Sequence, residues 1–115
     1  MKFALLINDD ETFHNYTDAQ KKEVVMAHKA YVEALGEAGV IVGGEPLAPS
    51  AEAVTIRPDG TVQDGPFADS KEQLGGFYLI DVKSRDEAIE WARRLPQCAP
   101  NGGGVEVRPV PDYSE

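Results

Sequence analysis

The order of apolar and amphipathic segments along this chain limits its fold more than any other feature. Each half contains a short apolar run, then a longer segment in which apolar residues recur every three or four positions, then a second apolar run. Short continuous apolar runs are typical of strands, and the longer spacing is typical of a helix with one apolar face. We therefore expect strands at 3–7, 40–42, 77–82 and 105–110, and helices at 18–37 and 85–95.

Polar residues at the start of each expected helix indicate where the helix begins. Thr17 is followed three residues later by Gln20, and Ser84 is followed three residues later by Glu87. In such a capping box the hydroxyl accepts an early backbone N–H, and the side chain three residues on bonds back to the first residue. Pro96 cannot continue a helix, so we expect the second helix to end before it.

A hairpin is expected between the two halves. Residues 53–57 alternate in the manner of a strand, residues 58–60 form a turn, and residues 61–63 return. We expect this hairpin to lie beside the strand at 40–42. Another turn follows the hairpin, and we expect Phe67 in that turn to pack at the edge of the core.

These elements predict one fold class. Two β-α-β units with right-handed crossovers place four strands in one antiparallel sheet and both helices on one face. The predicted fold is therefore α+β, a ferredoxin-like βαββαβ sandwich. A chain of 115 residues is long enough for one domain. We expect that domain at 1–110, followed by a loose C-terminal tail at 111–115.

The face of the sheet that points away from the helices needs a cover. Residues 3–7 and 77–80 place apolar side chains on both faces, and no remaining segment can cover the second face. A contiguous exposed apolar face marks an interaction site. We therefore expect a homodimer in which two sheets pack face to face.

The charge balance excludes several classes of partner. Lys and Arg total 11 and Asp and Glu total 20, which gives a formal net charge of −9. This surplus opposes binding to nucleic acid and to anionic membrane surfaces. No segment approaches the ~20 apolar residues of a membrane span, and the apolar start is too short for a signal peptide, so we expect a cytoplasmic protein. The single cysteine, Cys98, excludes an intrachain disulfide and a multi-cysteine zinc site.

The segment DGPFADSKEQLGGF at 64–77 resembles the signature of the DGPF proteins, a part of the YCII-related group in the dimeric α/β-barrel superfamily. The resemblance continues at 38–40, 86–89 and 107–109. It implies a dimeric α/β barrel. Some members are called transcription initiation proteins. Relatives in the wider YCII group are thought to use a His–Asp pair in a cleft, and one relative is a dehydrochlorinase.

His28 lies on the flank of the apolar face of the first helix and is the first candidate for chemistry. An imidazole titrates near ~6.5, so it can act as a general acid or base. Asp64 is its candidate partner, because a carboxylate can orient an imidazole or act as a base itself. The alternatives are structural: a half-buried His28 with one hydrogen bond, and an Asp64 that accepts N–H groups of its own turn.

Three further residues are candidates for ligand binding. Lys71 can hold an anion if it reaches a cleft, and Arg108 can do so if it points into the barrel. The alternatives are that Lys71 pairs with Glu72 or faces solvent, and that Arg108 pairs with an acid on the surface. Tyr31 can line a pocket or fill the core. The acidic residues at 9–11, near His14, lack the glycine-punctuated pattern of a cation loop, so we expect a solvated turn and no metal.

Two classes of function fit these residues. The first is a cofactor-free enzyme, because no redox or nucleotide motif is visible, with His28 and Asp64 performing acid–base chemistry on a small organic molecule. The second is a non-catalytic homodimer that binds a small ligand or a protein partner, in which the turn that begins at Asp64 fixes a loop between subunits. A transcription-associated accessory role is a third alternative, and the net charge argues against direct binding to nucleic acid.

Overall fold

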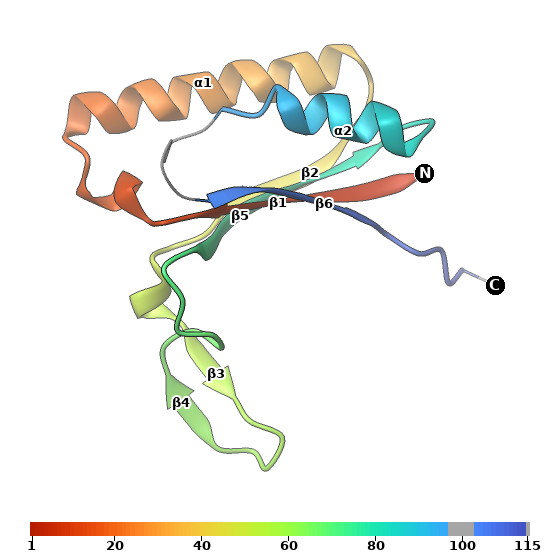
Figure 1. Cartoon of the computed structure of the whole chain (residues 1–115). Helices are drawn as coiled ribbons and strands as arrows, with labels where there is room; N and C mark the ends of the chain where they lie inside the picture. The colour runs from red at the N-terminus through yellow and green to blue at the C-terminus, as the bar shows by residue number, and fades with distance from the viewer. Residues whose placement is uncertain (97–102, 115) are drawn as a thin grey trace.

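The computed structural model describes residues 1–96 and 103–114, and Figure 1 shows the chain. The elements lie at β1 (Lys2–Asp9), η1 (Thr12–Asn15), α1 (Asp18–Glu37), β2 (Ile41–Pro46), η2 (Ser50–Glu52), β3 (Val54–Ile56), β4 (Val62–Asp64), β5 (Gln73–Asp81), α2 (Arg85–Arg93) and β6 (Gly103–Pro109). The expected strands and helices are all present. β1, β2 and β5 are longer than the sequence predicted, and α2 ends at Arg93, before the expected end at residue 95.

Four of the strands form one antiparallel sheet in the order β2-β5-β1-β6. The two central strands belong to different halves of the chain, so each β-α-β unit contributes one central and one edge strand. Both helices lie on the same face of this sheet (Figure 1). The predicted ferredoxin-like α+β fold is therefore confirmed.

The helix boundaries follow from their caps. At the start of α1 the Thr17 side chain accepts the N–H of Gln20 and the Gln20 side chain accepts the N–H of Thr17, which is the predicted capping box. At the start of α2 the Ser84 hydroxyl accepts the N–H of Glu87, but the Glu87 carboxylate accepts the N–H of Lys83 instead of Ser84. The second box is therefore half formed.

The core lies between the helices and one end of the sheet. Phe3 and Leu5 of β1, Ile80 of β5 and Leu35 of α1 are fully buried there, and Trp91 of α2 packs beside them. α2 has only nine residues, which is about 14 Å of helix, so it covers one end of the sheet only (Figure 1). The other end lies beneath the N-terminal part of α1 alone.

The hairpin corrects one prediction. β3 and β4 pair only with each other and form a separate two-stranded sheet that projects from the body on the side away from the helices (Figure 1). The expectation that the hairpin lies beside β2 is therefore wrong. The chain between β2 and the hairpin contains the turn η2, where the N–H and hydroxyl of Ser50 both bond to the Glu11 carboxylate. This attachment directs the chain away from the edge of β2.

We call residues 53–67 the arm. Phe67, at its end, is 76% exposed, so the prediction that Phe67 packs at the edge of the core is also wrong. The Arg57 guanidinium lies over its ring at 5.1 Å. Large apolar side chains on both strands of the arm are exposed, namely those of Val54, Ile56 and Val62.

The face of the sheet opposite the helices carries an apolar block. Ala4 pairs directly with Leu79, and Leu6 with Phe77, so these four side chains adjoin one another across β1 and β5. They alternate with the buried residues Phe3, Leu5, Tyr78 and Ile80 and therefore point away from the helices. The predicted open apolar face is present in the single chain.

Three further sequence predictions concern the C-terminal tail, the single cysteine and membrane spans. Residues 110–114 have no regular structure and are exposed. Cys98 lies outside the described residues. Across 1–96 and 103–114, neither helix combines the length and the apolar character needed to cross a bilayer.

Candidate functional site

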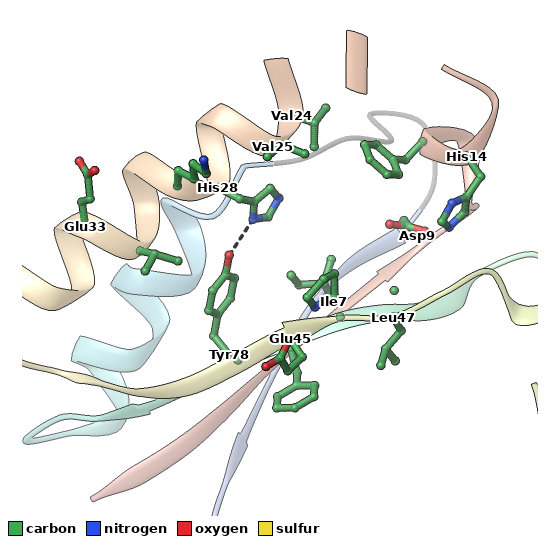
Figure 2. Close-up of a pocket in the computed structure, with 18 residues that line it drawn as sticks. Ile7, Asp9, His14, Val24, Val25, His28, Glu33, Glu45, Leu47 and Tyr78 are labelled. Carbon is green, nitrogen blue, oxygen red and sulfur yellow. Dashed lines mark hydrogen bonds between the residues drawn. The ribbon is translucent and has the colours of Figure 1, made fainter. Parts of the chain in front are cut away.

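A pocket of about 680 Å³ opens at the end of the sheet that α2 does not reach (Figure 2). Its roof is the middle of α1, from Val24 to Glu33, its floor is formed by β1, β2 and β5, and η1 closes one end. The volume is within the range of small-molecule sites, about 300–1,000 Å³.

Most of the pocket wall is apolar. The wide apolar face of α1 supplies part of the wall, and the strands supply the rest; these side chains include Ile7, Val24, Val25 and Val32. Val25 is 47% exposed and Val32 is 37% exposed. The valines that widen the helix face thus line the pocket instead of forming additional core.

His28 and Tyr78 form a pair inside this pocket. The Nδ1 of His28 on α1 lies 2.8 Å from the hydroxyl of Tyr78 on β5, which is a hydrogen bond between side chains 50 positions apart in the chain. The second ring nitrogen of His28 points away from Tyr78 into the pocket (Figure 2). His28 is half-buried on the flank of α1, where the sequence predicted it. Its hydrogen-bond partner is the phenol of Tyr78, and not the predicted carboxylate of Asp64.

Burial sets the protonation states of this pair. Desolvation lowers the pKa of His28 below its usual value of 6.5, so the imidazole is neutral near pH 7. Desolvation raises the pKa of Tyr78 above its usual value of 10.0, so its hydroxyl keeps its proton. A neutral imidazole and a neutral phenol therefore face each other across this hydrogen bond.

Gly44 makes the position of the Tyr78 ring possible. The two residues are direct partners between β2 and β5. A Cβ atom at position 44 would lie 2.7 Å from Cδ1 of Tyr78 and 2.7 Å from the carbonyl oxygen of Phe77, which is far closer than real contacts allow. The missing side chain at Gly44 thus leaves the space into which the Tyr78 ring leans.

Asp9 lies at the other end of the pocket, at the end of β1 (Figure 2). Its Oδ1 accepts the N–H of Glu11 at 2.9 Å. Its carboxylate lies over Gly75, where an added Cβ would come within 3.0 Å of Oδ2. The pairing of β1 with β5 skips Gly75 just before this point, so Gly75 is the bulged residue. Asp9 continues the alternation of Phe3, Leu5 and Ile7 along β1, which places its side chain on the face covered by the helices.

His14 on η1 lines the same end of the pocket as Asp9 (Figure 2). The sequence predicted that residues 9–11 and His14 form a solvated turn, and that reading missed their place at a pocket. A carboxylate and an imidazole are residue types common in functional sites, so the sequence did mark this turn. No spacing pattern in the sequence connects the turn to His28, however. Within the described part of the chain, His, Cys, Asp and Glu side chains form no group of three that could hold a metal.

The other predicted site residues lie elsewhere. Asp64 ends β4 on the arm and is exposed, and Lys71 is exposed in the loop that follows the arm; neither lines the pocket. Arg108 on β6 is exposed and pairs with Glu106. Tyr31 is buried in the core, where its hydroxyl donates to the carbonyl oxygen of Trp91 at 2.6 Å. Within the described chain, the half-buried carboxylate that lines the same pocket as His28 is that of Asp9.

The pocket carries more acid than base. Its lining includes the charged residues Asp9, Glu33 and Lys29. Glu45 lines it too, but Glu45 pairs with Phe77, so its carboxylate lies on the opposite face of the sheet. Asp9 is half-buried, and Glu33 and Lys29 are exposed. This balance makes the interior unfavourable for an anionic ligand.

Comparisons with known proteins give one family and one close relative. The family model described as the YCII-related domain matches residues 1–114 of the chain. An uncharacterized protein, R00369 of Rhizobium meliloti (strain 1021), is 40% identical over 121 aligned residues, which cover 98% of this chain and 94% of that protein. The similarity therefore extends over the whole fold, including the pocket and the arm.

Proposed function

This chain belongs to the YCII-related domain family, and from that premise we propose that its pocket binds a small, uncharged, largely apolar molecule and moves a proton on it. The observation that carries the proposal is the 2.8 Å hydrogen bond between His28 and Tyr78 inside a largely apolar cavity. Apolar walls with a few converging polar groups are typical of small-molecule sites.

The hydrogen bond between His28 and Tyr78 can form with either of two tautomers of His28, and each tautomer presents a different group to the pocket. When Nδ1–H of His28 donates to the Tyr78 oxygen, the lone pair of Nε2 faces the pocket and accepts a proton from the substrate. When the Tyr78 hydroxyl donates to Nδ1, Nε2–H faces the pocket and can donate to a substrate oxygen. The lowered pKa of His28 keeps the ring neutral and therefore ready to accept a proton near pH 7.

Asp9 completes the acid–base site in this proposal. Once His28 accepts a proton, it carries a positive charge inside the pocket. A carboxylate in the same pocket stabilises that charge, and Asp9 is the half-buried carboxylate of the lining. The His–Asp pair of this site is thus His28 with Asp9 across the bound molecule.

A proton-exchange assay tests the proposal without knowledge of the natural substrate. Methyl naphthyl ketone is uncharged, fits the cavity volume and carries weakly acidic C–H bonds beside its carbonyl. In D₂O the native protein is expected to exchange those protons for deuterium about 10²-fold faster than buffer, the lower end of general-base catalysis. NMR of the ketone measures the rate, and saturation-transfer NMR measures its binding.

Variants assign the exchange to the proposed groups. His28→Gln should still bind the ketone and lose the exchange, and Tyr78→Phe should reduce it. Asp64→Asn, a carboxylate change on the exposed arm, is the matched control and should keep the native rate. Exchange that persists in His28→Gln would contradict the catalytic role. Binding with no exchange in the native protein supports the second candidate, a non-catalytic ligand-binding module with the same pocket.

We also propose that the open face of the sheet pairs with a second copy of the chain. The block of Ala4, Leu6, Phe77 and Leu79 on that face supports this, because no helix of the described chain covers it (Figure 1). Sedimentation should give about twice the 12.5 kDa mass of one chain. Leu79→Glu should give a monomer, and Val25→Glu on α1 should leave the dimer intact. A native chain that stays monomeric at micromolar concentration would remove this proposal.

A further inference from the structure

We infer that this pocket selects molecules that carry a hydrogen-bond donor, such as a hydroxyl, at the end opposite His28, and that it rejects molecules that carry a carboxylate there. Asp9 is the residue that makes this selection. The inference rests on the proposed function, since it names the class of small molecule that the same pocket takes.

The Asp9 carboxylate is held in place by the surrounding backbone. Its Oδ1 accepts the N–H of Glu11 at 2.9 Å, which fixes the side chain against its own turn. Gly75 leaves room for it, because a Cβ there would come within 3.0 Å of Oδ2. A carboxylate that is already positioned loses little side-chain entropy when a ligand donates to it.

The turn that carries Asp9 and His14 is itself tied down. Glu11 adopts a left-handed backbone with φ of 65°, and its carboxylate accepts both the N–H of Ser50 at 2.6 Å and the Ser50 hydroxyl at 2.8 Å. These bonds join the turn after β1 to the segment after β2. These bonds hold the turn at this end of the pocket, so the Asp9 carboxylate has little freedom to move aside.

The middle of the pocket separates its two polar ends. Ile7 lies on the floor, and Val24 and Val25 of α1 lie on the roof, between the His28 end and the Asp9 end (Figure 2). A ligand that satisfies both ends has an apolar body with one polar group at each end. An acceptor such as a carbonyl fits Nε2–H of His28, and a donor fits Asp9.

Charge repulsion excludes the anionic counterpart. A ligand carboxylate at the Asp9 end would place two negative charges within one half-buried space, where like charges repel more strongly than in bulk water. A hydroxyl in the same position instead donates to the carboxylate, which makes a charge-assisted hydrogen bond.

Three ketones with one shared body test the inference. They are methyl naphthyl ketone, the derivative with a hydroxyl at the far end of the second ring, and the derivative with a carboxylate at that position. Dissociation constants are measured by ligand-observed NMR on the full chain at low salt. We expect the hydroxyl compound to bind native protein about tenfold tighter than the parent, and the carboxylate compound to bind at least tenfold weaker.

Two substitutions at the Asp9 end should change this order. Asp9→Asn removes the charge and should reduce the difference between the hydroxyl and carboxylate compounds to less than threefold. Gly75→Ala places a methyl group against Oδ2 of Asp9 and should weaken binding of the hydroxyl compound more than binding of the other two. The matched controls are Asp64→Asn on the arm and Gly43→Ala, whose added Cβ meets nothing within 4 Å. Both controls should keep the native order.

The outcomes separate this inference from the proposed function. Binding of all three ketones with equal affinity, or an order that Asp9→Asn leaves unchanged, overturns the selection by Asp9 and leaves the pocket as a binding site. Failure of all three to bind the native protein overturns the proposed function and this inference with it. His28→Gln should weaken binding of all three ketones by a similar factor and keep the order of their affinities, because His28 lies at the opposite end of the pocket from Asp9.

Discussion

Two tyrosines whose rings lie 5.3 Å apart have opposite surroundings on the same face of the sheet. Tyr31 belongs to the closed end, where α2 completes the core and its hydroxyl bonds to the carbonyl oxygen of Trp91. Tyr78 faces the open end, where its hydroxyl bonds to His28 in the pocket. The comparison teaches that the length of α2 decides which end of the sheet is filled with side chains and which is left for a ligand.

The largest expected effect concerns the closed end. Leu35 of α1 is fully buried, so Leu35→Ala should lower the free energy of unfolding by about 2–5 kcal/mol, through lost burial and the cavity left behind. Val25 lies on the same helix but at the pocket. Val25→Ala should lower the free energy of unfolding by less than about 1 kcal/mol and should weaken ligand binding. Urea denaturation measures both, and equal losses would mean that the two ends are packed alike.

Gly44 tests how the pocket end is built. Gly44→Ala forces a Cβ against the Tyr78 ring and the Phe77 carbonyl, which should cost about 1–3 kcal/mol and disrupt the bond between Tyr78 and His28. Gly43→Ala is the neighbouring control, with nothing within 4 Å of its added Cβ. NMR of the His28 ring detects the loss of the bond. An unchanged ring signal in folded Gly44→Ala would remove the positioning role.

Removal of each tyrosine hydroxyl sharpens the comparison directly. Tyr31→Phe deletes a buried hydrogen bond and should lower the free energy of unfolding by about 1 kcal/mol, with no effect on proton exchange at the pocket. Tyr78→Phe should reduce proton exchange. Thermal denaturation and the ketone assay together separate the two roles, and the comparison fails if Tyr31→Phe impairs exchange as strongly as Tyr78→Phe.

The pH dependence of stability reports on the open end. Burial makes the pKa of His28 lower in the folded chain than its unfolded value of 6.5. Below that value the unfolded chain takes up a proton that the folded chain resists, so this contribution to stability is complete above about pH 6.5 and is lost as the pH falls toward the folded pKa. His28→Gln should flatten that part of the profile, and His14→Gln should retain it. Urea denaturation across pH measures the slope.

The smallest effect is expected on the arm. Asp64 is exposed, so Asp64→Asn should change the free energy of unfolding by no more than about 0.5 kcal/mol and should leave ketone binding and exchange unchanged. A clear loss of exchange in this variant would mean that the arm of one chain reaches the pocket of another, and the contrast between pocket and arm would then hold for the single chain only.

Local patterns gave much of the fold. The capping residue Thr17 and the helical spacing placed α1, and the apolar runs placed the four strands of the sheet. The same reasoning failed for the hairpin and for Phe67, because strand propensity predicts a hairpin but not which sheet edge, if any, it joins.

The candidate site was predicted only in part. His28 was identified from its residue type and its place on the flank of a helix. Its hydrogen-bond partner Tyr78 and the carboxylate of Asp9 in the same pocket were not, because no local pattern connects α1 to the strands that carry them. Asp64 was favoured because it stands in a conspicuous motif, and the motif lies on the arm.

The sequence by itself determined the elements, their order and the sheet, because these depend on the spacing of apolar residues and on caps a few positions long. Only the tertiary structure decided that α2 leaves one end of the sheet uncovered, that Tyr78 leans over Gly44 toward His28, and that Asp9 shares their pocket. The physical reason is that contacts between distant strands and helices depend on element length and register, which no local pattern encodes.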